Sequence, residues 1–170
     1  MITRYFISIV IFIFAFFSGF AQDNVKKTKQ EQKLEQQLLT EDLMNFKIFD
    51  FVGVTAFSER GKPVSITSGP NTVSFSPEMI KSNLPFFGTA KTASAGYGRQ
   101  TGYMFEGKPE EYVMENTKKG YKLKAVVKTG NDSFTLNLSA GPDGGASLNI
   151  FSINRSSMRY SGEIKKTEPK

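Results

Sequence analysis

The distribution of apolar and polar positions divides this chain of 170 residues into three parts. Residues 1–21 contain one nearly continuous apolar run. Residues 22–45 are polar, with leucines at helical spacing. From residue 46 to about residue 165, apolar and polar residues alternate with a period of two, which indicates strands with one dry and one wet face. We therefore expect a leader, a helix and an all-β domain, in that order.

The first part has the pattern of a signal peptide that is removed on export. Arg4 precedes the apolar run Tyr5–Phe17, and the small residues Gly19 and Ala21 stand at the positions that signal peptidase requires. Cleavage at this site makes Gln22 the new N-terminus. The alternative is an uncleaved membrane anchor, but the apolar run is short compared with the ~20 residues that span a bilayer.

Residues 22–45 predict a polar helical leader before the β domain. Thr28 and Glu31 are spaced as a capping box, in which each side chain binds the backbone amide of the other residue. Leucines follow at near-helical spacing at positions 34, 38, 39 and 43. We expect an amphipathic helix over residues 29–44 that packs its leucines on the sheet. A partly frayed leader and a coiled-coil partner helix are the alternatives.

The remainder, residues 46–165, predicts eight to ten antiparallel strands. The first strand is expected to begin at Phe46 and to turn Phe46, Ile48, Val52 and Val54 to one face. Later strands alternate in the same way, with inward positions at Tyr121, Leu123, Ala125, Val127, Phe134, Leu136, Leu138, Ala146, Leu148 and Ile150. Gly, Asn and Pro residues separate the strands at short intervals, as hairpin turns require.

This arrangement predicts an all-β fold, an antiparallel meander with an N-terminal amphipathic helix. The sheet closes as a small, lipocalin-like barrel or folds over as a two-sheet sandwich, because alternation is the same in both. Residues 166–170 are expected to form a disordered tail.

Composition excludes several kinds of chemistry. The chain has no Cys, His or Trp, so a disulfide framework, a histidine base and the commonest zinc ligands are absent. The net charge of +6 falls to +5 when Arg4 leaves with the signal peptide. The basic residues are scattered rather than massed, which argues against nucleic-acid binding. Glu110 and Glu111 are neighbours in one strand and point to opposite faces, unlike the facing carboxylates of a glycosidase.

One long segment, residues 88–102, is rich in small residues and is a candidate binding loop. Tyr97, Arg99 and Tyr103 are the residues of this region that we expect to contact a ligand, and Phe86 and Phe87 directly before it complete the aromatic set. Its glycines do not have the spacing of a nucleotide-binding fingerprint. The simpler interpretation is a mobile connection.

Asp50 is the remaining candidate ligand-binding residue. Counting by two from Phe46 and Ile48 places its carboxylate on their apolar face, where a buried acid would need a partner or a raised pKa. The alternative is a bulge or an edge position that turns Asp50 outward.

The order of several short motifs resembles the domain of unknown function 4251 family. The motifs are Leu84-Pro85-Phe86-Phe87-Gly88, Phe105-Glu106-Gly107, Glu111-Tyr112, Lys128-Thr129 with Phe134-Thr135-Leu136, Gly145-Ala146-Ser147-Leu148, and Asn154-Arg155 followed by Tyr160-Ser161-Gly162-Glu163. The resemblance extends from about Phe46 to Ile164. It implies an exported protein of Bacteroidota with a charged helical leader before an all-β domain, and it implies no activity. Ser156-Ser157-Met158 departs from the Gln-Pro-type turn common in such proteins.

These observations favour a non-catalytic exported protein, periplasmic, outer-membrane-associated or secreted, that binds a small apolar or amphipathic ligand. The alternative is an envelope module for protein–protein interaction or structure. We expect no cofactor, no metal, no nucleic-acid partner, and no transmembrane span after signal cleavage.

Overall fold

The computed structural model describes residues 28–59, 61–91, 102–130 and 132–167. It contains one helix, α2 (Lys29–Phe46), and ten strands in those residues. The strands are β1 (Phe49–Ser58), β2 (Val64–Ser65), β3 (Thr72–Phe75), β4 (Ile80–Pro85), β5 (Gly102–Gly107), β6 (Pro109–Thr117), β7 (Gly120–Thr129), β8 (Asp132–Ala140), β9 (Gly145–Ser152) and β10 (Met158–Lys165). The predicted signal peptide, Tyr97 and Arg99 lie outside the described residues.

Helix α2 begins with the predicted capping box. The Thr28 amide donates to Oε2 of Glu31 at 2.8 Å, and the Glu31 amide donates to Oγ1 of Thr28 at 3.3 Å. The helix ends at Phe46, after which Lys47 adopts a positive φ of 58° and closes the last turn. Its buried residues are Thr40, Leu43 and Met44, which lie in its C-terminal half. Leucines 34 and 38 are exposed, so only part of the predicted leucine stripe packs on the sheet.

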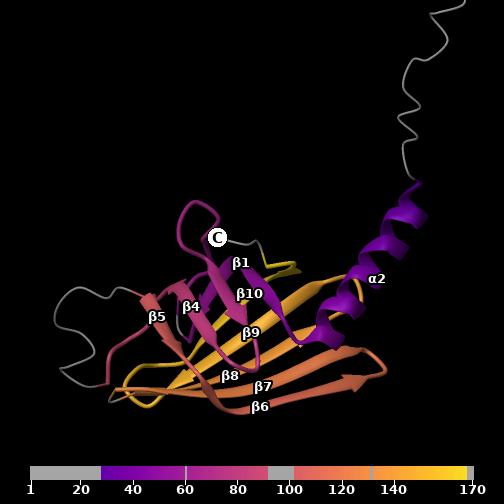
Figure 1. Ribbon diagram of the computed structural model, residues 1–170. Helices are drawn as coiled ribbons and strands as arrows, with labels where there is room; N and C mark the ends of the chain where they lie inside the picture. Colours follow the sequence, from indigo (N-terminus) through magenta and orange to yellow (C-terminus); the bar gives the residue numbers. More distant parts are fainter. Residues whose placement is uncertain (1–27, 60, 92–101, 131, 168–170) are drawn as a thin grey trace, which may run out of the picture. The chain divides into compact units, whose positions relative to one another are not determined.

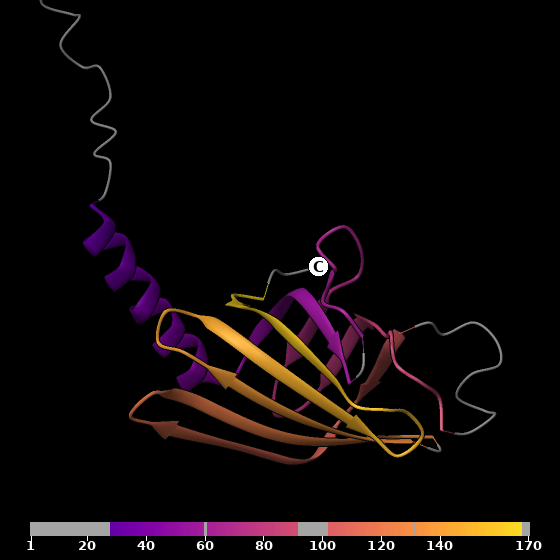
Figure 2. The ribbon, with the colours of Figure 1, turned by 180° about the vertical axis from the view of Figure 1, so that it is seen from behind.

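The strands form one antiparallel sheet in the order β5-β4-β3-β1-β10-β9-β8-β7-β6, and β2 pairs with the second half of β1. β1 therefore lies between β3 and the last strand of the chain, β10. The all-β, antiparallel prediction is confirmed, and the sheet is a nearly closed, barrel-like one rather than two separate sheets. Figure 1 shows β4 and β5 lying over β6, β7 and β8 as the sheet curls, and Figure 2 shows the same curl from behind.

The predicted phase of the first strand is wrong by one residue. β1 begins at Phe49, and Phe49 and Phe51 are the residues that point into the core. Phe46 belongs to α2, and Ile48 is exposed. The helix runs two residues further than Met44, and the left-handed Lys47 then redirects the chain, so the alternation starts later than the sequence pattern indicates.

Side chains from both ends of the strand order meet inside the sheet. The rings of Phe105 on β5 and Phe134 on β8 are stacked with centroids 4.0 Å apart, and Tyr103 meets Phe134 edge to face at 5.9 Å. Phe49 on β1 and its cross-strand partner Phe75 on β3 stack at 5.2 Å. Burial of such large apolar rings is the main source of stability in a chain without disulfides. Because Phe105 and Phe134 are in direct contact, side chains occupy the interior between β5 and β8.

Candidate functional site

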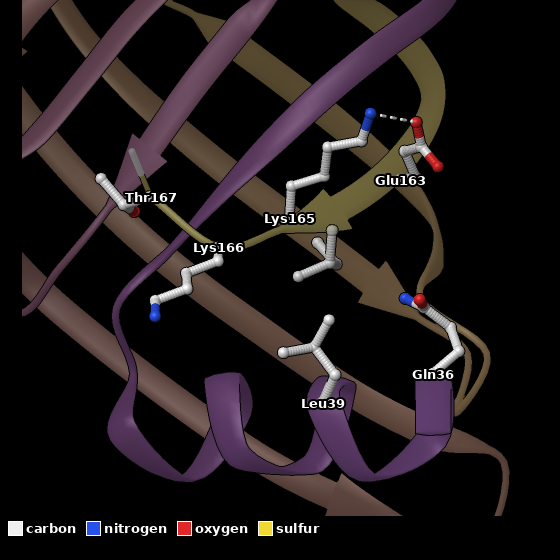
Figure 3. Close-up of a pocket in the computed structure, with 7 residues that line it drawn as sticks. Gln36, Leu39, Glu163, Lys165, Lys166 and Thr167 are labelled. Atoms are coloured by element: carbon white, nitrogen blue, oxygen red, sulfur yellow. Dashed lines mark ion pairs between the residues drawn. The ribbon is translucent and has the colours of Figure 1, made fainter. Parts of the chain in front are cut away.

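One surface hollow lies between helix α2 and the end of strand β10. It has a volume of about 470 Å³. Figure 3 shows the side chains around it, with Leu39 rising from the helix toward β10. The residues that line this hollow, called the α2–β10 pocket below, are Gln36, Leu39, Glu163, Ile164, Lys165, Lys166 and Thr167.

Local structure fixes the two sides of the α2–β10 pocket. The Ile164 amide donates to the Gly144 carbonyl at 2.8 Å, which ties the end of β10 to the β8–β9 turn. Gly144 has a φ of +84° and packs so closely against α2 that a Cβ would stand 2.8 Å from Nε2 of Gln36. The turn, the helix and the strand therefore hold one another in place at the pocket wall.

The pocket combines apolar and charged groups. Ile164 is almost fully buried, whereas Leu39 is 38% exposed and offers its methyl groups to an incoming molecule. Lys165 forms an ion pair with Glu163 at 2.8 Å. No carboxylate lies within ion-pair distance of Lys166 in the ranges that the structure describes. The pocket thus has an apolar floor and one ammonium group that is free to meet an anion.

Asp50 lies next to this pocket, and the prediction that places it on the buried face is wrong. Phe49 and Phe51, its neighbours, fill the core, so Asp50 points to the opposite side of β1 and is half-buried. Its Oδ1 accepts a hydrogen bond from the Thr167 hydroxyl at 3.1 Å. The outward alternative is the one that the structure supports, and the carboxylate anchors the chain directly after β10.

The second hollow, of about 380 Å³, lies where β1 and β4 end. Its lining residues are Ser58, Glu59, Gly61, Phe87, Gly88, Thr89 and Ser156. Thr89 and Ser156 hold two distant segments together: the Ser156 amide donates to the Thr89 carbonyl, and the Thr89 amide donates to Oγ of Ser156, both at 2.9 Å. Phe87, a predicted ligand contact, is 45% exposed here.

Phe86 and Tyr103, two further predicted contacts, lie together beside this second hollow. Their rings meet edge to face at 5.1 Å, and the guanidinium carbon of Arg155 lies 5.5 Å from the Phe86 centroid. Nη1 of Arg155 donates to the Gly102 carbonyl at 2.6 Å. Tyr103 is fully buried, its hydroxyl donates to the Ser156 carbonyl at 2.6 Å, and burial raises its pKa well above the usual value. Tyr103 therefore supports the wall of the hollow from inside.

The α2–β10 pocket could not be identified from the sequence. Leu39 was part of the predicted leucine stripe, which we expected to be covered by the sheet. Lys166 and Thr167 were assigned to the tail after the last strand. Only the folded chain brings these two segments together, since about 125 residues separate them in the sequence. Leu34 and Leu38 are exposed as well and only Leu43 of this stripe is buried, so no feature of the sequence singles out Leu39.

The described residues contain no group of three or more acidic side chains placed to hold a metal ion. In the same ranges, no helix combines the length and apolar character that crossing a bilayer requires.

Comparison with known proteins agrees with the sequence motifs. A family model described as "Domain of unknown function (DUF4251)" matches residues 28–164. The fold is similar to the crystal structure of a DUF4251 family protein from Bacteroides eggerthii DSM 20697, with a TM-score of 0.64 and 15% sequence identity over 81% of this chain and 92% of that one. The search of curated proteins returns no match. The resemblance stated from the motifs is thus confirmed, together with the fold.

Proposed function

This chain belongs to the DUF4251 family, and from that premise we propose that it is an exported, non-catalytic protein of the cell envelope that binds a small amphipathic ligand in the α2–β10 pocket. The supporting observation is the composition of that pocket, in which the methyl groups of Leu39 and Ile164 lie beside the ammonium group of Lys166, which has no carboxylate partner among the described residues.

The ligand class follows from these groups. An alkyl chain laid against Leu39 and Ile164 gains about 25 cal/mol for each Å² of apolar surface that leaves water. A carboxylate or phosphate head forms an ion pair with Lys166. An exposed ion pair of this kind contributes about 0.2–1 kcal/mol. Gln36 stands across the pocket from Lys166 in Figure 3 and supplies an amide for polar head atoms. A short fatty acid or a similar anionic amphiphile combines both features.

We propose a binding site on the surface because side chains fill the interior of the curled sheet. Phe105 stacks on Phe134, and Phe51, Tyr160 and Leu148 are fully buried. An apolar ligand inside the sheet would have to displace these side chains, with the loss of contacts that such close packing provides. The pocket at α2 needs no such displacement.

A titration of the exported protein with decanoate tests this proposal. We expect the methyl NMR signals of Leu39 and Ile164 to shift with a common saturation curve. Lys166→Gln should weaken binding about two- to fivefold, the value of one exposed ion pair. Leu39→Asp should weaken it more, about fivefold or beyond, because a charge then faces the alkyl chain.

Leu38→Asp is the matched control, because Leu38 is on the same helix, is 55% exposed and does not line the pocket. Equal loss of binding in the Leu38 and Leu39 variants would contradict the proposed position of the ligand. An absence of shifts at both methyl groups throughout the titration would reject the function itself.

Export is supported by the apolar run and the Gly19–Ala21 exit, and has its own test. Protein recovered from an envelope or secreted fraction should begin at Gln22 by N-terminal sequencing. An intact Met1 on the recovered protein would contradict the proposed processing.

The alternative function, an interaction module, is favoured by one observation. Leu34, Leu38 and Phe46 expose 57%, 55% and 75% of their surface on α2. Such residues are typical of contact surfaces when they form one patch. Self-association that Leu34→Asp abolishes, together with no response to decanoate, would support this alternative over ligand binding.

A further inference from the structure

The outer face of five neighbouring strands, β7, β8, β9, β10 and β1, carries a row of side chains at one register level. Lys124 is opposite Asn137, Asn137 is opposite Asn149, Asn149 is opposite Arg159, and Arg159 is opposite Phe57. These residues point away from the core, because their neighbours along each strand are buried. We call this set the asparagine row. It crosses the strands at right angles to their direction.

A second row, made of four small hydroxyl side chains with a lysine at one end, runs beside the asparagine row. It consists of Lys122, Ser139, Ser147, Ser161 and Thr55, again in direct cross-strand register. Serine side chains are short, so this row lies lower than its neighbour and leaves the amides of the asparagine row accessible from one side. Figure 2 shows β7 to β10, in orange to yellow, side by side along the sheet.

The two asparagines at the centre of the row are available to a ligand. Asn137 and Asn149 are half-buried and face each other across β8 and β9. Within the described residues, neither side-chain amide has a hydrogen-bond partner. Asparagine is unfavourable in strands, where threonine or valine would stabilise the sheet more. This pair of adjacent amides in the middle of the sheet therefore lowers the stability of the protein. The same amides offer hydrogen-bond donors and acceptors to a ligand.

The charges on this face are largely balanced. Lys124 pairs with Glu111 at 2.9 Å, and Lys128 pairs with Glu110 at 2.8 Å. The guanidinium of Arg159 lies over the Phe57 ring, 4.6 Å from its centroid. Lys122 and Arg159 are the cations of the two rows that have no carboxylate partner in the described residues. A nucleic acid or another polyanion requires a run of unpaired cations along its path, and these two are separated by the uncharged Asn and Ser side chains of β8 and β9. The centre of the face is therefore suited to a neutral partner.

The centre of the face also differs from that of a protein interface. Such interfaces have an apolar core with a polar rim, whereas here amides and hydroxyls occupy the centre. The apolar element, Phe151, stands to one side opposite Thr135 and is 47% exposed. A ring of aromatic carbon beside rows of amides and hydroxyls matches a molecule that has both C–H faces and many hydroxyl groups.

We propose that the asparagine row binds a neutral oligosaccharide. The planar amides of Asn137 and Asn149 each donate to one sugar hydroxyl and accept from another. Adjacent strands are about 4.8 Å apart, which is comparable to the length of one sugar ring along a glycan chain. Successive rings can therefore meet successive strands, and the C–H face of one ring packs on Phe151. This site is separate from the α2–β10 pocket and does not depend on the function proposed for it.

The test is an NMR titration of the exported protein with three neutral hexasaccharides, cellohexaose, laminarihexaose and maltohexaose. We expect at least one of them to shift the side-chain amide signals of Asn137 and Asn149. The double variant Asn137→Thr/Asn149→Thr should weaken binding of that glycan at least tenfold while its melting temperature stays equal or rises, because threonine suits a strand better. A merely structural role for the asparagines would not combine these two results.

Asn83→Thr is the matched control, since Asn83 is an exposed strand asparagine on β4, outside the asparagine row. It should leave glycan binding unchanged, as should Leu39→Asp in the α2–β10 pocket. The absence of amide shifts with all three glycans overturns the proposal. So does binding of heparin at low salt without binding of any neutral glycan, which would identify the face as one for polyanions.

Discussion

The Tyr103 hydroxyl donates to the backbone carbonyl oxygen of Ser156 at 2.6 Å, and both groups are buried. The two residues are 53 positions apart in the sequence. This bond joins the start of β5 to the connection between β9 and β10, on the side of the sheet where the second hollow lies. The bond fixes the wall of that hollow, although the two segments it joins are not paired as neighbouring strands.

Tyr103→Phe should therefore destabilise the fold. The substitution leaves the Ser156 carbonyl buried without its donor, which costs about 1–3 kcal/mol of the free energy of unfolding. Urea denaturation measures the change. Tyr112→Phe is the control, because the Tyr112 hydroxyl donates to the Lys47 carbonyl at 3.0 Å in an exposed position, where the loss should stay below about 1 kcal/mol. Equal effects would show that burial does not decide the contribution of these bonds.

Stability should also fall in alkaline solution. Burial raises the pKa of Tyr103 and of Tyr160 well above their usual value of 10.0. A raised folded-state pKa means that the contribution to stability is complete below about pH 10 and declines as pH rises toward the folded-state value. Each such tyrosine lowers stability by about 1.4 kcal/mol per pH unit in that window.

Thermal melts between pH 7 and pH 12 measure this dependence. Tyr160→Phe should lose less stability than the parent protein above pH 10, because one of the tyrosines whose pKa burial raises is gone. An unchanged alkaline slope in that variant would contradict the assignment. Comparison of slopes rather than absolute values removes the contribution of lysines, which titrate in the same range in both proteins.

The stack of Phe105 on Phe134 should be essential to the curled sheet. Phe105→Ala removes a buried ring that meets its partner at 4.0 Å, and we expect a loss of about 3–5 kcal/mol. Met104→Ala, at the neighbouring position with 42% exposure, should cost much less. Hydrogen exchange of the β5 amides should rise in the first variant alone. Similar stability losses in both would show that the ring contact does not hold β5 in place.

The β1–β10 pair contains a close approach that only glycine allows. A Cβ on Gly162 would overlap the Val52 carbonyl oxygen and lie 2.9 Å from the Cα of Gly53, next to the register shift in β1. Both obstacles are backbone atoms, so no side-chain movement relieves them. Gly162→Ala should destabilise the protein by about 2 kcal/mol or more. Gly130→Ala meets no atom within 4 Å at its Cβ, and its smaller cost should arise from its positive φ alone.

The capping box should act locally. Thr28→Ala removes the acceptor of the Glu31 amide, a change worth about 1 kcal/mol to a helix terminus. The first half of α2 has no buried residues, since those lie at Thr40 and beyond. We therefore expect faster hydrogen exchange in the first turns of α2 with the global melting temperature nearly unchanged. A large drop in melting temperature would show that the helix terminus is coupled to the core.

Much of the fold could be predicted because strands with one buried face repeat every two residues. In β8, Phe134, Leu136 and Leu138 alternate with polar neighbours, and the structure buries all three. The phase of β1 could not be predicted in the same way. Phe46 and Ile48 continue the alternation backward into the helix, and nothing local marks Lys47 as the left-handed residue that ends it. The count by two that puts Asp50 on the apolar face fails for this reason, and the outward alternative holds.

The candidate sites were less predictable than the fold because they depend on which segments meet. Phe86 and Tyr103 flank one sequence segment, and the structure does bring their rings together. Leu39 and Lys166 share a pocket only because β10 lies beside β1, directly after the helix. Hydrophobic periodicity describes which face of a strand is dry, and it contains no information on strand order. The asparagine row likewise requires the register of five strands.

The strand order ends at β5 on one side and at β6 on the other, and Lys108 alone connects these two strands along the chain. In the described residues, no ladder bridges them. The position of β5 relative to the strands at the other end of the order is therefore held by side-chain packing, such as Phe105 on Phe134, and not by main-chain hydrogen bonds. β6 is the last strand of the order, so one of its edges has no partner strand in the described residues. The charges of Glu110 and Glu115 on β6 discourage pairing of this edge with a strand of another chain. In the described residues, the curled sheet therefore keeps two unpaired edges, β5 and β6, and the ladders between the other strands do not fix the distance between them.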